Sequence, residues 1–393
     1  MKIADVIAGT DRAFYVFDSR ALHARIRYLQ SLLPERVELC YAIKANPFLV
    51  REAENAVSRL EICSPGEAEI CFALGVDSRK MVISGVYKTP AFIEELVANP
   101  DFHGIFTAES ESQFALLSRL AEKYDRVLPV LPRVTNDSQF GMDRDVVEKI
   151  VRNRAQSAHI ELRGIQFFSG TQKTSLKKLR REIEHMDAFL TRLKDECGFI
   201  APEFEYGTGF PVSYFEGEAL DEEALIRGFS EILGEMENKP KITLELGRSI
   251  AASCGRYFTR VVDMKTNANQ NYLLVDGGMH HITYFGQYMA MKQPYFSVFG
   301  KEDAPKTDRW NIVGSLCSMN DILVKAAPLP EMEIGDALVF ENAGAYCMTE
   351  GMSLFLSRDL PRIYLIGEDG ELYRARASFE TYTLNTPHYE RMD

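Results

Sequence analysis

The chain has 393 residues, a hydrophobic content of 46% and a formal net charge of −12. The acidic balance argues against nucleic acid or an anionic membrane surface as a main partner, and seven cysteines without CxxC pairs argue against a disulfide framework or a structural metal site. The N-terminus lacks an apolar signal core, and no stretch approaches the roughly 18 apolar residues of a membrane span, so we expect a cytoplasmic protein.

A strand is expected at 13–18, and eight further apolar runs predict strands after it. These runs cover 37–43, 60–63, 81–84, 104–107, 127–133, 162–168, 204–206 and 242–246. Amphipathic stretches between them predict helices at 65–74, 90–98, 109–123, 146–158, 175–196 and 221–236. Eight strands alternating with helices over about 250 residues predict a (β/α)8 TIM-type barrel. A doubly wound sheet is the runner-up, disfavoured because no GxGxxG turn follows the first strand.

The pattern changes after Arg248, where short β-rich runs with turn signals replace the helices. These runs lie at 253–265, 270–276, 310–313, 336–340 and 362–366. A chain of this length exceeds one hydrophobic core. We therefore expect an α/β protein of two domains: the barrel at 28–252, and a C-terminal β-sheet domain made of 1–27 and 253–393, which the N-terminal strand completes.

Lys44 stands at the end of the run at 37–43, which Asn46 and Pro47 terminate. Burial there would desolvate the amine and favour the neutral, nucleophilic form that a Schiff base requires. A lysine at a strand end more often extends its amine into solvent. The functional interpretation therefore depends on the other strand ends, because barrels of this type carry their catalytic groups there.

Polar and glycine-rich segments follow the other predicted strands. They include Ser64-Pro65-Gly66-Glu67, Phe168-Ser169-Gly170-Thr171-Gln172, Gly207-Thr208-Gly209-Phe210 and Glu245-Leu246-Gly247-Arg248. Glycines allow backbone N–H groups to approach closely, and hydroxyl and guanidinium groups bind phosphate oxygens, so the later loops suit a phosphate. Gly207-Thr208-Gly209 alone is typical of a plain turn; the prediction depends on the compatible strand ends together with Lys44.

These motifs resemble those of the fold-type III pyridoxal-phosphate decarboxylases, the group of diaminopimelate, ornithine and arginine decarboxylases. Tyr41-Ala42-Ile43-Lys44-Ala45-Asn46 is similar to their Schiff-base lysine motif, and Gly207-Thr208-Gly209-Phe210 to their phosphate loop. Four later segments also resemble family motifs: Glu245-Leu246-Gly247-Arg248, Val275-Asp276-Gly277-Gly278-Met279, Gly314-Ser315-Leu316-Cys317 and Gly344-Ala345-Tyr346. The motifs keep the family's order and span nearly the whole chain.

The resemblance implies pyridoxal 5'-phosphate as cofactor, α-decarboxylation of an amino acid as reaction, and a homodimer with shared active sites. It implies that Lys44 holds the cofactor covalently, that Glu245 keeps the pyridine nitrogen protonated, and that Cys317 reprotonates the α-carbon. Without the motifs, Cys317 would be an apolar filler and Glu245 an ion-pair partner of Arg248. Further cofactor contacts that the resemblance implies are Glu61, Arg133, Phe168, Thr171, Gly207, Thr208, Gly209, Gly247, Arg248 and Tyr346.

Three departures from the family pattern concern the substrate. Phe168 replaces the histidine that stacks on the cofactor, Ser318 replaces the acid after the catalytic cysteine, and the run 280–287 replaces an Arg-Pro pair. A buried ammonium without a carboxylate is costly, so a free diamino acid is disfavoured. Candidate substrate contacts are Ser318, Tyr284, His280 and His281.

The run 280–287 and Asp321 resemble a specialised secondary-metabolism branch of the family, which includes decarboxylases of glutamate tethered to an acyl-carrier protein. Such a carrier protein is therefore a candidate partner beside the small-molecule amino acid. Three alternatives stay open: a diaminopimelate-, ornithine- or lysine-type decarboxylase of a free diamino acid, an alanine-racemase-like enzyme, and a catalytically silent homologue with a binding or regulatory role. Glu245 and Cys317 favour decarboxylation over racemisation, and Lys44 with Cys317 argues against silence.

Overall fold

The computed structural model describes residues 3–10 and 12–392, which divide into two compact units. The larger unit comprises His23–Val212 and Leu220–Ile250; the smaller one takes the residues up to Leu22, the segment Ser213–Ala219, and the chain from Ala251 onward. The sequence predicted that Ser213–Ala219 would belong to the barrel. It belongs to the smaller unit because Tyr214 and Phe215 pack on the ring of Tyr284, at centroid distances of 5.3 and 6.1 Å.

In the described part of the chain, an eight-stranded parallel barrel forms the larger unit, which confirms the predicted fold class. The strands follow the spatial order β5-β4-β3-β2-β10-β9-β8-β6, and β5 pairs with β6 to close the barrel. Their bounds are β2 (Val37–Ala42), β3 (Arg59–Ile62), β4 (Met81–Ile83), β5 (Ile105–Ala108), β6 (Leu128–Val134), β8 (Gly164–Phe168), β9 (Glu203–Gly207) and β10 (Lys241–Leu246). The run predicted at 162–168 is interrupted at Arg163, where β7 (Ile160–Leu162) ends.

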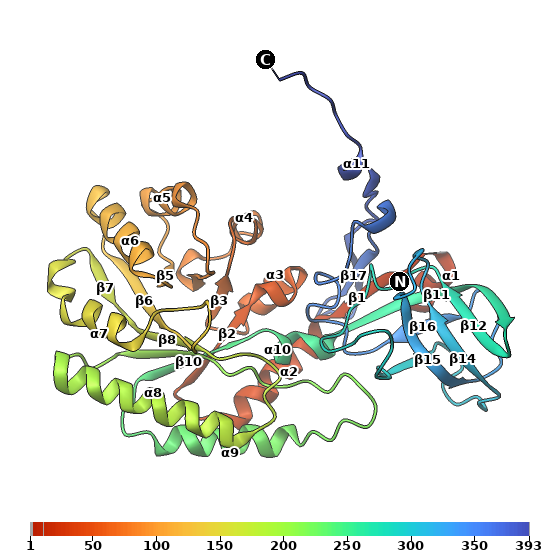
Figure 1. Cartoon of the computed structure of the whole chain (residues 1–393), viewed down its shortest axis with the longest axis horizontal. Coiled ribbons are helices and arrows are strands. Elements are labelled where there is room, and N and C mark those ends of the chain that lie inside the picture. Colours follow the sequence, from red (N-terminus) through yellow and green to blue (C-terminus); the bar gives the residue numbers. More distant parts are fainter. Residues whose placement is uncertain (1–2, 11, 393) are drawn as a thin grey trace. The chain divides into compact units, whose positions relative to one another are not determined.

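Helices lie on the outside of the barrel strands (Figure 1). They are α4 (Pro65–Ala73), α5 (Pro90–Ala98), α6 (Glu111–Lys123), α7 (Arg144–Arg152), α8 (Leu176–Cys197) and α9 (Glu222–Glu235). In α8, the Ser175 side chain caps the first turn, and Gly198, with φ 59°, ends the helix in the left-handed conformation. None of the described helices combines the length and apolar composition needed to cross a membrane.

The barrel interior is apolar on one side. Cys40, Val82, Ile105 and Leu131 form a buried cluster there, with one residue from each of β2, β4, β5 and β6. The other four strands, β8, β9 and β10 opposite this cluster and β3 between β2 and β4, contribute buried polar side chains: Arg59, Glu61, Gln166, Glu203, Glu205 and Glu245. Charged groups are rarely buried without partners, so these strands are where chemistry is expected.

The smaller unit contains a mixed sheet whose main path is β15-β14-β12-β11-β1-β17-β18, with β16 paired to β11 and β13. The N-terminal strand β1 pairs antiparallel with β11 and parallel with β17, which confirms that it completes this sheet. The bounds are β1 (Phe14–Asp18), β11 (Gly255–Asn267), β12 (Gln270–Val275), β13 (Phe296–Val298), β14 (Asp308–Val313), β15 (Ile322–Leu329), β16 (Ala337–Phe340), β17 (Arg362–Ile366) and β18 (Leu372–Arg376).

The remaining helices are α1 (Ile3–Gly9), α2 (Ser19–Leu32), α3 (Val50–Glu54), α10 (Arg248–Ala251) and α11 (Tyr382–Asn385). Of these, α2 is long enough to be expected from the sequence, but the sequence analysis did not name it. The apolar core of the smaller unit includes Val6, Phe14, Val16, Phe258, Val339, Tyr364 and Ile366.

Candidate active site

Lys44 lies directly after β2, in a single 3₁₀ turn over Ile43–Ala45. Its Nζ donates a hydrogen bond to Glu61 Oε2 at 2.8 Å and lies 3.4 Å from Cys63 Sγ. The two strand ends meet because β2 and β3 pair in parallel, with Ala42 opposite Glu61. The Lys44 side chain is 42% exposed. The sequence predicted a desolvated neutral amine; the structure shows an accessible amine paired with a buried carboxylate instead.

Glu61 is held in its ionised form. Burial alone would raise the pKa of Glu61, but the charge of Lys44, the hydrogen bonds from Lys44 and Cys63, and the charge of Arg133 together hold this pKa below its ordinary value. Burial and the charge of Glu61 raise the pKa of the Cys63 thiol well above its usual range. Cys63 therefore stays protonated and donates to Glu61 Oε1 at 3.4 Å. No sequence motif marked Cys63 as a site residue.

Glu67 fixes the strand end below this cluster. The backbone N–H of Glu67 donates to Ser64 Oγ at 3.2 Å, and Glu67 Oε2 accepts from the backbone N–H of Cys63 at 2.6 Å. This arrangement is a variant of the capping box that begins α4. Glu67 thus supports the end of β3.

Glu245 lies near the end of β10, inside the barrel, and is 8% exposed. Gln166 Nε2 donates to Glu245 Oε1 at 2.7 Å. Burial and the negative charge of Glu61 raise the pKa of Glu245, against the opposing effects of Glu205, Lys44 and Gln166. A carboxyl group in such surroundings is a suitable partner for a protonated ring nitrogen, because a bound cation would offset its burial.

Arg133 and Phe168 form a wall beside these groups. Arg133 Nη1 donates to Glu109 Oε1 at 2.7 Å, and its guanidinium lies 4.9 Å from the Phe140 ring centroid and 5.7 Å from that of Phe168. The buried Arg133 Nε has no hydrogen-bond partner among the described residues and remains available as a donor. A Cβ on Gly207 would lie 2.2 Å from the Phe168 ring, so this glycine allows the ring to sit against the backbone.

The loops that follow β8, β9 and β10 come together. Gly209 has φ +63°, and a Cβ there would lie 2.0 Å from the carbonyl oxygen of Gly170. The backbone N–H of Lys173 donates to the Gly209 carbonyl at 2.9 Å, and Arg248 Nε donates to Thr171 Oγ1 at 3.4 Å. These loops also contain the predicted contacts Gly207, Thr208 and Gly247. Glycine backbone, a hydroxyl and a buried guanidinium form a cradle that suits a phosphate group.

The barrel groups therefore fit one kind of ligand. They offer an amine for a covalent bond to a carbonyl carbon, a carboxyl group for a protonated nitrogen, an aromatic wall for a flat ring, and an anion cradle. A heteroaromatic aldehyde that carries a phosphate has all four complementary features.

Cys317 belongs to the smaller unit, where it is exposed in the loop between β14 and β15. Asp321 fixes this loop, since its carboxylate accepts from the backbone N–H of Leu316 at 2.8 Å and of Met279 at 2.7 Å. A Cβ on Gly278 would come within 2.6 Å of that carboxylate. Two of the sequence motifs thus form one fixed structure that presents the thiol.

His280 and His281 are buried, with 2% and 6% exposure. His281 Nδ1 lies 3.1 Å from the Tyr257 hydroxyl, and its Nε2 lies 2.8 Å from the Asp359 carbonyl oxygen. Burial and the neighbouring charges of His281 and Arg358 lower the pKa of His280 to about 3, so this ring is neutral. The sequence predicted both histidines as substrate contacts, and in this structure they are buried within the smaller unit.

The other predicted contacts of this unit differ in exposure. The buried Tyr284 hydroxyl donates to the Glu341 carbonyl at 2.5 Å, and its ring lines a pocket of about 110 Å³ without any charged lining side chain among the described residues. Ser318 is half-buried, and its Oγ accepts from the backbone N–H of Asn320 at 3.2 Å. Tyr346 is half-buried in a turn and has φ 63°.

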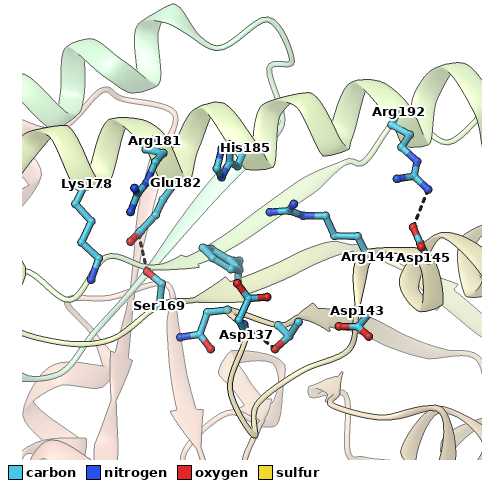
Figure 2. Close-up of a pocket in the computed structure, with 13 residues that line it drawn as sticks. Asp137, Asp143, Arg144, Asp145, Ser169, Lys178, Arg181, Glu182, His185 and Arg192 are labelled. Atoms are coloured by element: carbon cyan, nitrogen blue, oxygen red, sulfur yellow. Dashed lines mark hydrogen bonds and ion pairs between the residues drawn. The ribbon is translucent and has the colours of Figure 1, made fainter.

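Figure 2 shows a pocket of the larger unit. Its volume is about 700 Å³, and it lies between α8, the loop after β6 and the start of α7. Its charged lining residues in the described chain are Arg144, Lys178, Arg181, Arg192, Asp137, Asp143, Asp145 and Glu182. The acidic and basic groups balance, so the pocket favours neither charge of ligand, and no predicted site residue lines it.

Comparisons with known proteins agree with this chemistry. Residues 19–252 match the family model described as pyridoxal-dependent decarboxylase, pyridoxal binding domain. The L-glutamyl-[BtrI acyl-carrier protein] decarboxylase of Niallia circulans is 26% identical, over 95% of this chain and 94% of that protein. A diaminopimelate decarboxylase of Neisseria meningitidis serogroup A is 27% identical, over 94% of each. The structure of Helicobacter pylori diaminopimelate decarboxylase with L-lysine superposes with a TM-score of 0.84 over 98% of each chain, at 21% identity.

Proposed function

The chain belongs to the pyridoxal-dependent decarboxylase family, and from this premise we propose that it decarboxylates an amino acid or amino-acid conjugate whose distal end carries no ammonium. The family model covers more than half of the chain. The protein is therefore a pyridoxal-phosphate-dependent amino-acid decarboxylase, a carboxy-lyase. Glutamate tethered to a carrier protein through its distal carboxyl group is the substrate that we favour.

We assign the cofactor contacts to the residues of the barrel unit. When bound, the cofactor accepts the electron pair that stays on the substrate's α-carbon as carbon dioxide leaves. Lys44 would hold it covalently, Glu245 would bind the ring nitrogen, and Phe168 would face the ring. The phosphate would occupy the cradle of Thr171, Gly207, Thr208, Gly209, Gly247 and Arg248, and Glu61 and Arg133 would complete the site. Tyr346, a residue of the smaller unit, stays a prediction of the family resemblance.

The absence of an available carboxylate on the Cys317 loop supports the substrate proposal. Ser318 follows the cysteine, and the one carboxylate of the loop, Asp321, already accepts two backbone N–H groups in the described structure. The small pocket beside this loop, which Met279 and Asn320 line, also lacks charged side chains among the described residues. A buried ammonium without its carboxylate loses about 2–5 kcal/mol, so a diamino acid would bind weakly.

The relatives are consistent with more than one substrate. The Niallia circulans protein is named for a carrier-bound glutamyl substrate and the Neisseria meningitidis protein for diaminopimelate, at nearly equal identities. Two lysines that could contact an acidic carrier, Lys173 and Lys292, are ion-paired with Glu182 and Glu218. The proposal therefore depends on the Cys317 loop and not on a basic docking surface.

Carbon dioxide release from a substrate panel tests the proposal. The panel contains lysine, ornithine, meso-diaminopimelate, a γ-glutamyl amide and a carrier-bound glutamyl thioester. We expect carbon dioxide release only from the γ-glutamyl amide and the carrier-bound glutamyl thioester.

Ser318→Glu restores an acid beside Cys317 and should raise the kcat/KM for lysine. Efficient turnover of a free diamino acid by the natural sequence would contradict the proposal, and Glu350→Gln would then show whether exposed Glu350 supplies the missing charge. No release from any substrate would favour a silent homologue.

We further propose that the enzyme acts in the cytoplasm as a homodimer with shared active sites. The family resemblance implies that Cys317 reaches the active site of the partner subunit. Its exposed position at a loop tip is compatible with that role.

A further inference from the structure

A buried arginine organises the interior of the barrel below Glu245. Arg59 Nη2 donates to Glu203 Oε2 at 2.9 Å, and Arg59 Nη1 donates to Glu203 Oε1 and, at 3.1 Å, to Glu205 Oε2. The Thr243 hydroxyl adds a bond to Glu203 Oε1 at 3.1 Å. Glu203 therefore has every partner that an ionised carboxylate needs. Its negative charge balances the positive charge of Arg59. Arg59 therefore has no net positive charge left to balance an ionised Glu205.

Glu205 faces Glu245 and Gln166 on its other side. It is 0% exposed. The register of β9 and β10 places Thr243 opposite Glu205, so Glu245, two residues further along β10, lies on the same face. The register of β8 and β9 places Gln166 directly opposite Glu205. Glu205 thus stands between the guanidinium of Arg59 and the group that we assign to the ring nitrogen.

This layer of the barrel lacks hydrogen-bond donors. Glu205 Oε1 and Gln166 Oε1 are both buried without a hydrogen-bond partner among the described residues. If Glu205 and Glu245 were both ionised, two negative charges would also face each other away from water. Unsatisfied buried acceptors and paired like charges are both expensive. A single proton on Glu205 removes the like-charge repulsion and turns one of the two unpaired acceptors into a donor.

We propose that Glu205 is held as a neutral carboxylic acid that donates a hydrogen bond to Glu245, and that it is the positioning residue that sets the proton affinity of Glu245. Burial, together with the charge and hydrogen bond of Glu245, raises the pKa of Glu205 well above its usual range, although Arg59 opposes the shift. The other titratable neighbours of Glu205 are Cys40, whose pKa burial also raises well above its usual range, and Glu203; the ionised Glu61 acts on Glu245.

Glu205 would thereby affect whether the proton shared between Glu245 and a bound cofactor lies on the carboxylate or on the ring nitrogen. A hydrogen bond from Glu205 stabilises the anion of Glu245 and makes it a weaker base. The proton between Glu245 and a bound ring nitrogen then stays on the nitrogen. This holds for any substrate of the enzyme, so it does not depend on the substrate proposal, but it rests on the proposed assignment of Glu245 to the ring nitrogen.

Glu205→Gln is the matched variant, because its amide oxygen can accept from Arg59 while its N–H donates to Glu245, as the neutral acid does. We expect the infrared spectrum of the purified protein at neutral pH to contain the carbonyl band of a protonated carboxylic acid, and Glu205→Gln to lack it. The control is Glu182→Gln: burial alone would raise the pKa of Glu182, but its hydrogen bonds to Lys173, Ser169 and Tyr206 hold it low, so this variant should keep the band. A band that persists in Glu205→Gln, or no band in the natural protein, would overturn the proposal.

Stability against pH gives a second test. Because the folded-state pKa of Glu205 is raised, its contribution is most favourable below its unfolded pKa of about 4.3 and is lost as pH rises through the folded-state value. The Tm of Glu205→Gln minus that of the natural protein should therefore increase with pH above about 4.3. A constant difference would contradict a neutral acid. If Glu205→Gln does not fold, Glu205→Asp serves, since the infrared band should then shift and not vanish.

A cofactor readout separates positioning from simple structural support. With ring-labelled ¹⁵N cofactor, the nitrogen chemical shift should report a protonated ring in the natural protein and in Glu205→Gln, and a less protonated ring in Glu205→Leu. We expect kcat/KM to stay within about threefold for Glu205→Gln and to fall by about tenfold to a hundredfold for Glu205→Leu. An unchanged nitrogen shift in Glu205→Leu would refute the positioning role.

Discussion

In the role that we propose, Lys44 must lose a proton before its nitrogen can bond to a carbonyl carbon, and Glu61 is in position to receive it. Glu61 Oε2 lies 2.8 Å from Lys44 Nζ, and its lowered pKa keeps it ionised when the cofactor arrives. The exposure of the lysine side chain leaves room for an incoming carbonyl group. The pair therefore provides both the nucleophile and the nearest base, although the lysine is not desolvated in this structure.

We predict that borohydride reduction of the holoenzyme places the cofactor on Lys44. Peptide mapping should find the label on the peptide that contains Lys44 and no label in Lys44→Ala. Lys173→Ala is the control: the Lys173 amine is buried and bonded to Glu182 at 2.7 Å, so its removal should leave the label in place. A label on Lys173 or on any other lysine would show that the attachment site is wrongly assigned.

Residue roles were predictable only where a motif marked them. Lys44 and Glu245 stand in short patterns that resemble a family, so the sequence marks them as candidates. Gln166 and Glu205 are isolated polar residues within apolar runs, and their importance follows from which face of the strand they occupy. Each lies two residues from a strand-end candidate, Phe168 and Gly207, and this spacing of two along a strand is the signal that would have found them.

The loops after β8 and β9 form the cradle because both can approach without side chains. Gly209 combines a left-handed φ of +63° with a Cβ position 2.0 Å from the Gly170 carbonyl oxygen. Lys173 then links the two loops through the Gly209 carbonyl. The loop that we assign to the phosphate thus has little room for any residue but glycine at this position.

We predict that Gly209→Ala weakens cofactor binding. The backbone strain alone costs about 1–3 kcal/mol, or roughly fivefold to a hundredfold in Kd, and the clash with Gly170 adds to it. Gly217→Ala is the control, since Gly217 has a comparable φ of +78° but open space around its Cβ position. Titration of the apoprotein, followed by absorbance, measures both constants. Equal Kd values for the two variants would show that the cradle does not hold the phosphate.

Elements of the barrel could be predicted because their residues are apolar and regularly spaced. The helix α5 lies where the sequence placed it, and the strands β4 and β10 agree to within one residue. Strands β13 and β18 were not predicted because they are short or largely exposed, so no apolar run marks them. β15 contains a lysine and a proline within its eight residues, which obscures its strand character.

Each of the two units is built from segments that are separated along the chain. The sequence predicted that the first strand would join the later sheet, and its pairing with β11 and β17 confirms this. It did not predict that Ser213–Ala219 belongs to the smaller unit, because the aromatic contacts of Tyr214 and Phe215 are long-range and leave no periodic signal.

The smaller unit exposes several large apolar side chains around the segments that carry Cys317 and Tyr346. Met319 is 88% exposed, and the others are Phe285, Met352, Leu354, Phe355 and Leu356. Exposed apolar side chains that gather in this way are typical of protein interfaces. They are consistent with the homodimer that we propose.

We predict that two inactive variants restore activity to each other. Lys44→Ala lacks the attachment group and Cys317→Ala the proton donor, and each homodimer should show little native turnover. If each site combines Lys44 of one subunit with Cys317 of its partner, a two-fold heterodimer contains one native site and one site that lacks both groups. Random co-assembly should then recover about a quarter of the natural activity.

Co-expression with two different affinity tags isolates the heterodimer, and sedimentation verifies its mass. A tagged heterodimer without recovered turnover would show that the two residues do not meet across an interface, and a monomeric mass for an active enzyme would exclude shared sites altogether.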